Sequence, residues 1–585
     1  MHRCWLLQLS VAIALLLGNA VDATAESTHA WWVYFSDKGF DSVLEEDRAL
    51  DRAAEMLTPR ALARRQKVRG DTPVDFLDLP VSPDYVRAVI GTGATERHRL
   101  RWFNAVTVNA TDSQVARIRE LRFVARVRRV AQQVHRTWEP ETADRITPDR
   151  TLPDRIAPDG ASPSDGRGPN PHLRGSLNYG ECASQLVPIQ VDQLHDQGLS
   201  GAGVRVAVFD TGFRRSHTAL TGVNVVAEWD FVQGDANTEN EAGDVSGQHN
   251  HGSYVLSILA GFDPGNLIGP AYGAEFLLGK TETLASETPA EEDNWAAAAQ
   301  WADSLGADII TSSLSYIDWY TWDDLDGDTA TITIAADLAA ANGISVFTSA
   351  GNWGSQDWFY IGPPSDGDSV IAVGAVDSTG TLGSFSSHGP SIDGRTKPDV
   401  CAMGVATYFA LATDNVSYSR GNGTSFSCPI TAGVGALLQE AHPAWGPWEI
   451  REALRSTATQ AGAPDNDYGW GVIRGLDASG HATGAPTVAT RAGNAIRVSP
   501  NPSAAVTSLR WSLPAGERAL SLELVDVAGR RVRELEPTGG TADRTIGAAT
   551  WDGRDASGTP VATGVYFARL HTSAGSHVSR VVRIR

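Results

Sequence analysis

The chain has 585 residues, of which 42% are hydrophobic and 20% are charged, and a formal net charge of −21. This composition is typical of folded globular domains and argues against long disorder or a helical membrane bundle. An acidic chain also lacks the basic face that a nucleic-acid-binding protein needs. Four cysteines are too few for a disulfide scaffold, and the length predicts three or more domains, at about 100–200 residues each.

The negative charge is concentrated in the middle of the chain. Residues 173–476 contain 11 Lys and Arg against 37 Asp and Glu, whereas the two flanks carry net charges of only +1 and +4. The flanks and the middle are therefore expected to be different domains.

Residues 1–25 have the pattern of a secretory signal peptide. Arg3 precedes the apolar run Trp5–Leu17, and Ala23-Thr24-Ala25 provides a cleavage site. The alternative is a transmembrane anchor, but the run is shorter than the roughly 20 residues that a span needs. We therefore expect a secreted or cell-surface protein. Three cysteines remain after the signal is removed, and because three is odd, at least one thiol is free or pairs with another chain. These cysteines are Cys182, Cys401 and Cys428.

Residues 26–135 are predicted to form a small α+β domain. The expected strands are Trp31–Phe35, Phe103–Val108 and Phe123–Val130, and the expected helices are Ala53–Gln66, Pro83–Val89 and Ser113–Leu121. Residues 136–172 form a Pro-rich linker in which the five-residue pattern Arg-x-x-Pro-Asp occurs three times. Such a segment is expected to be extended and open to proteolysis.

Residues 173–477 alternate short apolar runs with helical stretches. This alternation predicts βαβ units, and therefore an α/β domain with a parallel sheet flanked by helices. The expected strands are 204–209, 276–278, 308–310, 344–347 and 370–373, and the expected helices are 296–305 and 332–341. A connection at 478–493 then leads to an all-β region at 494–585, for which we expect a β-sandwich.

Three polar residues of the middle domain stand where strands end or helices begin. Asp210 directly follows the apolar run Val206–Phe209, His251 precedes an apolar helical segment, and Ser425 precedes the helical run Ile430–Glu440. Functional residues of open α/β sheets gather at the carboxyl ends of the strands. A serine at the start of a helix also has a free backbone N–H in the positive end of the helix dipole.

The motifs around these residues resemble those of the subtilisin-like serine peptidases of family S8. The sequences VFDTG at 208–212, NHGSYV at 250–255, SAGN at 349–352 and GTS at 423–425 occur in the order that this family uses, Asp then His then Ser. Each motif is weak alone, but four in order within one α/β domain give a strong signal.

The resemblance implies a role for each motif. Ser425 is the expected nucleophile, His251 the general base and acid, and Asp210 the residue that orients and stabilises the imidazole. Asn352 and the backbone N–H of Ser425 are expected to bind the oxyanion. The resemblance further assigns Ser313, Leu314, Ser315, Ala350 and Gly351 to substrate binding, where an extended peptide would pair with the backbone.

Several alternatives remain open. His249 could be the base in place of His251, and Asp210 and Asn352 could be turn or capping residues. The sedolisins share the Gly-Thr-Ser nucleophile, but they use Glu as base and Asp at the oxyanion site, so His251 and Asn352 argue against that family. A catalytically inactive binding protein, whose function lies in the C-terminal domain, is the second class of function.

No cofactor is expected, although a structural calcium ion is an alternative. Asp324, Asp326 and Asp328 have a spacing that suits Ca²⁺, but the start of a helix capped at Asp328-Thr329 is the favoured interpretation. Cys428 is expected to be a small buried residue behind Ser425. The acidic and aromatic stretches at 291–295 and 322–327 resemble a subgroup of secreted bacterial proteases, and the alternative for them is a solvated surface.

The flanking regions also resemble known modules. Residues 26–135 resemble the propeptide of the same subgroup, which would dock electrostatically on the acidic domain, since residues 30–134 hold 18 Lys and Arg against 14 Asp and Glu. Residues 494–585 resemble immunoglobulin-like domains related to flagellar hook-capping and secretion-sorting domains. The expected partners are protein or peptide substrates, the chain's own propeptide and cell-surface or secretion machinery, and no nucleic acid.

Overall fold

The computed structural model describes residues 26–130 except 41, residues 173–481 except 175–176 and 286–287, and most of residues 496–583. The gaps in this last range are 500–502, 504–505, 514–517, 527–530, 537–538, 541–544, 563 and 574. The predicted signal peptide, the Pro-rich linker and most of the 478–493 connection lie outside the described residues. Within the described part, no helix is long and apolar enough to cross a bilayer.

The N-terminal region is a four-stranded antiparallel sheet with helices. Its elements are β1 (His29–Phe35), α2 (Val43–Glu55), α3 (Pro59–Arg69), α4 (Pro83–Ile90), β2 (Thr95–Leu100), β3 (Ala105–Ala110), α5 (Asp112–Arg119) and β4 (Val124–Arg129). The strand order is β2-β3-β1-β4. The predicted α+β architecture is therefore present.

Two differences between the predicted and observed elements of this region have a clear local cause. The single helix expected at 53–66 is two helices, because the Thr58 side chain accepts a hydrogen bond from the Ala61 N–H and Pro59 takes the first helical position. The strand expected from Phe103 begins at Ala105, because Arg101–Phe103 form a 3₁₀ turn and Asn104 is left-handed with φ 49°.

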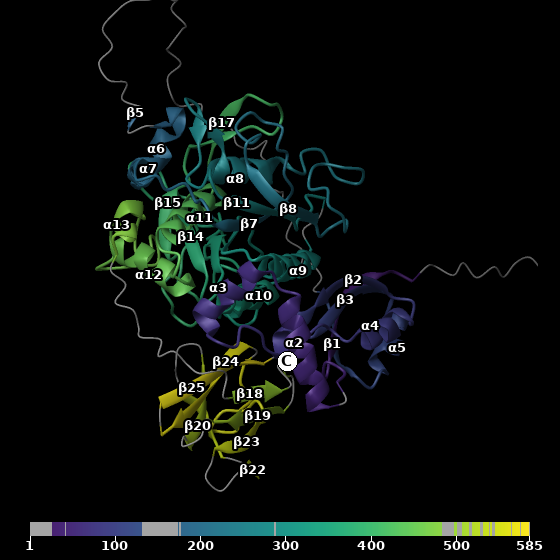
Figure 1. The fold of residues 1–585 in the computed structure, drawn as a ribbon. Helices are drawn as coiled ribbons and strands as arrows, with labels where there is room; N and C mark the ends of the chain where they lie inside the picture. The colour runs from purple at the N-terminus through teal and green to yellow at the C-terminus, as the bar shows by residue number, and fades with distance from the viewer. Residues whose placement is uncertain are drawn as a thin grey trace, which may run out of the picture.

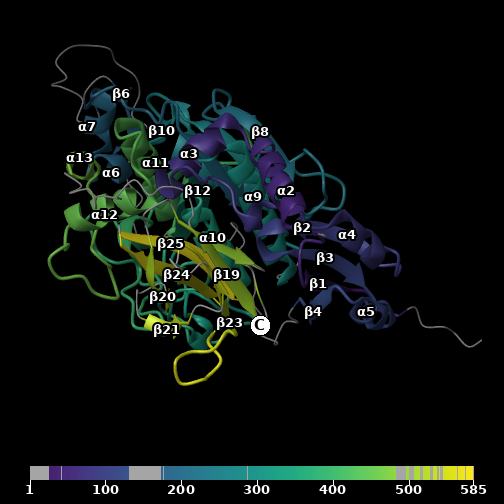
Figure 2. The same cartoon turned by 60° about the horizontal axis from the view of Figure 1, so that its bottom comes forward.

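Alternate residues of β1 face two different cores. Trp31, Val33 and Phe35 pack with the apolar residues of α4 and α5. Trp32 and Tyr34 pack instead against the middle region, in a cluster with residues of helices α9 (Ala290–Leu305) and α10 (Thr331–Ala341). Because strand side chains alternate between faces, one short strand joins the N-terminal region to the middle region. Figures 1 and 2 both show the purple N-terminal elements lying beside these helices.

The middle region contains a seven-stranded parallel sheet with the order β15-β14-β13-β12-β7-β11-β8. In chain order the strands are β7 (Arg205–Asp210), β8 (Asn224–Asp230), β11 (Glu275–Lys280), β12 (Ile309–Ser312), β13 (Ser345–Ser349), β14 (Ile371–Val376) and β15 (Val400–Met403). The parallel sheet is the one that the sequence predicts. Strands β8 and β15, at its two edges, were not predicted.

Helices cover both faces of this sheet, and β7 shows how. Val206 and Val208 pack with α8 (Asn250–Ala260) and α11 (Thr424–Ala441), whereas Ala207 and Phe209 pack with α9 and α10. A parallel strand buried on both faces is apolar throughout, which explains the continuous apolar run before Asp210. The remaining elements of this region are β5 (Leu173–Arg174), β6 (Leu177–Asn178), α6 (Ala183–Leu186), α7 (Val191–Asp196), β9 (Phe262–Asp263), β10 (Leu267–Ile268), β16 (Thr407–Ala410), β17 (Tyr418–Gly421), α12 (Pro447–Thr457) and α13 (Gly475–Ser479).

The C-terminal region is made of two four-stranded sheets, as expected for a β-sandwich, with the orders β18-β19-β23-β22 and β21-β20-β24-β25. Their bounds are β18 (Ile496–Ser499), β19 (Thr507–Ser512), β20 (Ala519–Asp526), β21 (Arg531–Leu535), β22 (Gly539–Gly540), β23 (Ile546–Trp551), β24 (Gly564–Thr572) and β25 (Gly575–Arg583). Residues of both sheets, among them Leu509, Trp551, Leu524 and Leu570, form one buried cluster. This region is drawn in yellow in Figure 1.

Candidate active site

The predicted site residues gather at the carboxyl edge of the parallel sheet. Asp210 is the last residue of β7, while His251 and Ser425 are each the second residue of their helices, α8 and α11. Both helices pack on the same face of the sheet. Their N-termini therefore meet at the edge where β7 ends, as expected for a site in an open α/β sheet.

Asp210 is fully buried and holds the imidazole of His251. Its Oδ1 lies 2.7 Å from His251 Nδ1 and accepts hydrogen bonds from the Thr211 N–H at 2.7 Å and the Thr211 hydroxyl at 3.1 Å. A carboxylate only accepts, so Nδ1 carries the proton and Nε2 is left with its lone pair. Burial opposes a charge on His251, but the charge and hydrogen bond of Asp210 outweigh it and raise the pKa of this histidine.

The glycine after His251 allows this contact. A Cβ on Gly252 would lie 2.2 Å from the Gly212 carbonyl oxygen and 3.0 Å from Asp210 Cβ. Any larger residue would push the start of α8 away from the end of β7. The His-Gly pair of the motif therefore has a steric cause.

The second histidine of the motif has a different environment. His249 Nδ1 accepts a hydrogen bond from the Asn240 N–H at 3.0 Å, and the His249 carbonyl accepts one from the Ser253 hydroxyl at 2.6 Å. Burial lowers the pKa of His249. These contacts tie the loop before α8 to the helix and leave Asp210 paired with His251.

Ser425 contacts Ser313, the residue after β12, through two hydrogen bonds. Its hydroxyl donates to the Ser313 carbonyl at 3.4 Å, and the Ser313 hydroxyl donates to the Ser425 carbonyl at 2.9 Å. The ring of the next residue, Phe426, stacks near the imidazole of His251 with centroids 6.4 Å apart. The structure thus brings the three predicted residues into one small region.

The Asn352 side chain is oriented by the residue before the serine. Its Oδ1 accepts hydrogen bonds from the Thr424 N–H at 2.9 Å and the Thr424 hydroxyl at 3.0 Å, so its Nδ2 is the end that points elsewhere. A Cβ on Gly423 would lie 3.6 Å from the Ser425 nitrogen and 3.8 Å from Asn352 Nδ2. The Ser425 N–H and the Asn352 Nδ2 therefore border the same space. This space stays open because Gly423 has no side chain.

Two backbone segments predicted to bind substrate lie near each other. Segment 313–315 follows β12, and segment 350–351 follows the neighbouring strand β13. Residues 362–363 connect them: the Gly362 N–H donates to the Ala350 carbonyl at 3.4 Å, and the Ser315 hydroxyl donates to the Pro363 carbonyl at 3.2 Å. Leu314 is half-buried, and the Gly351 N–H donates to the Thr424 hydroxyl at 3.2 Å.

Two buried carboxylates, which sequence reasoning did not connect with the site, hold the segment after Ser315. Tyr316 donates to Glu282, and Glu292 accepts hydrogen bonds from Trp319 Nε1 at 2.6 Å and the Tyr320 hydroxyl at 2.7 Å. Glu292 is only 3% exposed, so the alternative of a solvated surface is wrong at this residue. The signal that could have found it is the aromatic run at 316–320.

Two of the three acidic residues considered as calcium ligands, Asp324 and Asp326, accept hydrogen bonds from backbone groups. Asp326 Oδ1 accepts from the N–H groups of Asp328 and Thr329 at 2.9 and 2.7 Å, and Asp324 Oδ2 accepts from the Thr321 N–H at 2.8 Å. The expectation that Asp328-Thr329 caps a helix is wrong, because the N-cap of α10 is Ala330, with no side-chain cap.

A second acidic group has carboxylate oxygens within 4.8 Å of one another, namely those of Asp230, Asp235 and Glu241. There, Lys280 Nζ lies 2.7 Å from Asp230 Oδ2 and supplies a fixed positive charge. This arrangement does not favour a divalent ion.

The three cysteines of the described chain are free and buried. Cys428 lies behind the nucleophile position, 3.5 Å from the Thr311 hydroxyl, and burial raises its pKa to about 12. A thiol of this kind is an inert packing residue, as the sequence predicts.

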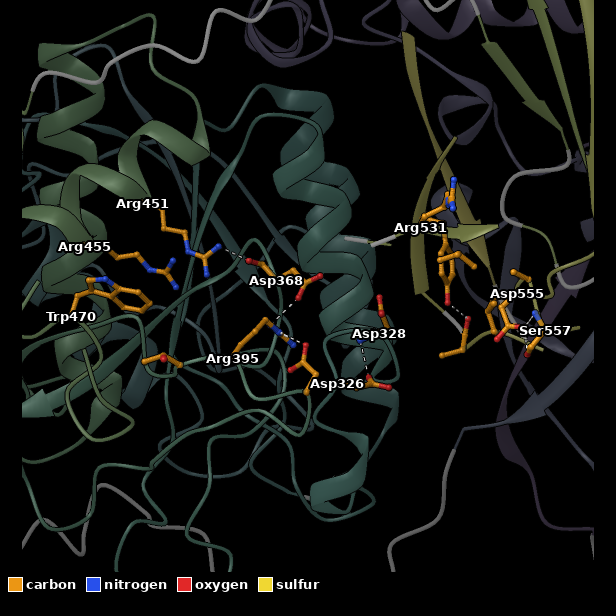
Figure 3. Close-up of a pocket in the computed structure, with 17 residues that line it drawn as sticks. Asp326, Asp328, Asp368, Arg395, Arg451, Arg455, Trp470, Arg531, Asp555 and Ser557 are labelled. Carbon is orange, nitrogen blue, oxygen red and sulfur yellow. Dashed lines mark hydrogen bonds and ion pairs between the residues drawn. The ribbon is translucent and has the colours of Figure 1, made fainter. Parts of the chain in front are cut away.

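A cavity of about 980 Å³ lies elsewhere, between the middle region and the C-terminal strands. Figure 3 shows its side chains: Arg395, Arg451 and Arg455 on one side, Arg531 and Asp555 on the other. The arginines of the middle region are already paired, since Arg395 lies 2.9 Å from Asp368 and Arg451 lies 2.8 Å from Asp399. None of the predicted site residues lines this cavity.

The N-terminal region is held on α9 by buried ion pairs. Asp303 of α9, fully buried, contacts Arg64 and Arg65 of α3, and Arg101 lies 3.3 Å from it. Burial alone would raise the pKa of Asp303, but Arg65, Arg64 and Arg101 lower it. The basic N-terminal region thus docks on the acidic domain through paired, desolvated charges.

Residues 201–471 match the Subtilase family, and residues 30–145 match the Peptidase S8 propeptide domain of Bacteroidota. Subtilisin DY of Bacillus licheniformis is 35% identical over 298 residues, which cover 50% of this chain and 97% of the relative. The subtilisin of Bacillus pumilus is 33% identical over 297 residues, which cover 50% of this chain and 98% of the relative. The chain, with its parallel sheet and propeptide domain, therefore belongs to the subtilisin-like (S8) serine peptidases.

Proposed function

We propose that this chain is a secreted serine endopeptidase in which Asp210, His251 and Ser425 form the catalytic triad. The observation that carries the proposal is the 2.7 Å contact between Asp210 Oδ1 and His251 Nδ1, at an imidazole that stacks near Phe426, the residue after Ser425. It favours the tautomer in which Nε2 can take the proton from Ser425. The serine oxygen then attacks the peptide carbonyl, and His251 returns the proton to the leaving amine.

Asn352 and the Ser425 N–H would stabilise the oxyanion of the tetrahedral intermediate. Both donors border the space above Gly423. Donors held in place before the reaction stabilise the developing charge without having to reorganise. A water molecule then hydrolyses the acyl-enzyme by the same steps in reverse order.

The substrates are extended protein or peptide segments. Segments 313–315 and 350–351 follow two adjacent parallel strands, so their backbone groups can pair with a substrate strand. No cofactor takes part in these steps.

The enzyme is made as a zymogen. Residues 26–135 are the propeptide, and we place the processing cleavage in the Pro-rich linker at 136–172. Residues 1–25 direct secretion, and the C-terminal sheets form an immunoglobulin-like module that sorts, anchors or binds.

The decisive experiment compares the secreted protein with its Ser425→Ala variant on casein. We expect the wild type to cleave casein and the variant to be inactive. Equal activity in both would reject Ser425 as the nucleophile, and inactivity of both would favour a binding protein. The variant should also remain full-length beyond Ala25, whereas normal maturation of the purified variant would reject self-processing.

A further inference from the structure

The ring of Trp353 lies against two glycines that flank the proposed substrate groove. A Cβ on Gly351 would lie 2.4 Å from Trp353 Cζ3, and a Cβ on Gly362 would lie 2.9 Å from the same atom. Both distances are shorter than any carbon–carbon contact that a folded protein tolerates. The edge of the indole therefore occupies the space that a side chain at either glycine position would need.

Two further side chains reach the same place. The Cβ position of Gly362 is 2.4 Å from the hydroxyl oxygen of Ser315 and 3.0 Å from Ile317 Cγ2. The gap between segments 313–315 and 350–351 is thus occupied by an indole edge, a hydroxyl and a methyl group. In a packed interior, space that is already filled admits another group only at a cost.

The backbone that carries the indole is fixed on both sides. The Trp353 N–H donates to the Ser387 hydroxyl at 3.0 Å, and the Gly354 N–H donates to the Phe385 carbonyl at 2.8 Å. A Cβ on Gly354 would lie 2.1 Å from the Ser386 carbonyl oxygen, so this turn is packed tightly against segment 385–387. The ring is therefore held in the gap by its own chain.

We propose that Trp353, with Ser315, restricts cleavage to peptide bonds that follow a small residue: Gly, Ala or Ser. This inference rests on the proposed function. The Ser425 hydroxyl lies 3.4 Å from the Ser313 carbonyl, so the residue whose carbonyl is attacked lies beside segment 313–315. We place its side chain in the gap toward Gly362, where Ser315 Oγ and Trp353 Cζ3 already lie 2.4 and 2.9 Å from the Cβ position of that glycine and oppose a large group.

The test uses the processed enzyme and a series of peptide anilides that differ only in the residue before the cleaved bond: Gly, Ala, Leu or Phe. We expect kcat/KM for Ala to exceed that for Phe by at least about tenfold, since a single methylene that a pocket cannot hold is worth about 10–200-fold. In Trp353→Ala the ratio of kcat/KM for Phe to that for Ala should rise at least about tenfold. Trp353→Phe should give an intermediate ratio.

Trp358→Ala is the matched control. Trp358 belongs to the same loop, but its Nε1 donates to the Ile361 carbonyl at 3.0 Å and it packs in a different cluster, around Leu325. If loosening of the loop were the cause, this variant would change the ratio as much as Trp353→Ala does, and that result would overturn the proposal. Equal wild-type cleavage after Phe and Ala would also overturn it while leaving the peptidase function intact. Cleavage of no anilide and no casein would instead reject the proposed function itself.

Discussion

Two buried carboxylates of the catalytic domain, Asp210 and Asp303, differ in where their partners come from. Both side chains are fully buried. Asp210 contacts Thr211 and His251, which belong to the catalytic domain itself. The charged partners of Asp303 belong to the propeptide, which supplies three arginines.

This difference indicates that the surroundings of Asp303 depend on the propeptide, whereas those of Asp210 do not. When the propeptide leaves, Asp210 retains every described partner, whereas Asp303 loses its arginines. The ion pairs of Asp303 exist only while the propeptide is bound, so α9 depends on the propeptide for these contacts in a way that Asp210 does not. The propeptide therefore acts on the helix layer beneath the sheet, and the site geometry is set by the catalytic domain alone.

The largest effect is expected from Asp210→Asn. The amide keeps the shape of the carboxylate but removes the charge and the acceptor that select the tautomer of His251. We expect kcat to fall by about 10⁴-fold, with the fold intact. The measurement is kcat on a peptide anilide, together with circular dichroism of the variant.

A loss of activity in Asp210→Asn that is accompanied by unfolding would not support the assignment. A loss of less than tenfold in a folded variant would contradict it. Asp303→Asn is the comparison, because in the processed enzyme it should keep nearly wild-type kcat.

Asp303→Asn should instead destabilise the zymogen. In a full-length Ser425→Ala background the change leaves three guanidinium groups around a neutral amide. Breaking a buried ion pair costs about 3–5 kcal/mol, so the midpoint of urea unfolding should fall clearly. In the processed enzyme, where the arginines are gone, the same change should not be destabilising.

The matched control for this experiment is Asp84→Asn. Asp84 forms an ion pair with Arg87 within the propeptide, but both side chains are more than 70% exposed. Exposed pairs contribute little to stability, so the unfolding midpoint should barely move. Equal effects of the two substitutions on the zymogen would contradict the role given to Asp303.

The sequence indicates the candidate site residues more clearly than it indicates the interface between α9 and the propeptide. The reason is physical. Asp210 and Ser425 stand next to a strand end and a helix start, and these local signals persist in the fold. Asp303 lies within an Ala-rich helix, and its partners Arg64 and Arg65 are about 240 residues away in the chain. Pairings of this kind depend on which surfaces meet, and no local pattern encodes them.

Some errors in single elements also arise from contacts between distant segments, whereas others can be explained by a local signal in the sequence. The helix expected at 53–66 is divided at Thr58-Pro59, a capping signal that good helix formers on both sides concealed. Trp353 follows Asn352 directly, but its role depends on Gly362 and Ser315, which reach it from other segments. The edge strands β8 and β15 were not among the predicted strands.

Asn352→Ala tests the proposed oxyanion-binding part of the site. Removing one oxyanion donor should lower kcat by about 10²–10³-fold and leave KM nearly unchanged, because the interaction is made in the transition state. The measurement separates kcat from KM on one peptide anilide. Thr424→Val is informative beside it: the valine lacks the hydroxyl that holds Asn352 Oδ1 at 3.0 Å, so a smaller fall in kcat is expected.

The smallest expected effect is on the pH dependence of activity. This measurement tests the comparison of Asp210 with Asp303 most directly. In the proposed mechanism His251 acts as a base only when neutral, and Asp210 raises its pKa above the ordinary value of 6.5. Activity should therefore be lost, as the pH falls, at a midpoint above 6.5 in the profile of kcat/KM, which reports the free enzyme. Asp210→Asn should move that midpoint to lower pH, because the neutral amide no longer favours the imidazolium. Asp303→Asn should leave it in place, since Asp303 contacts the propeptide arginines and not His251. A wild-type midpoint at or below 6.5 would contradict the effect of Asp210 on His251, and equal shifts in the two variants would show that the two carboxylates are not independent.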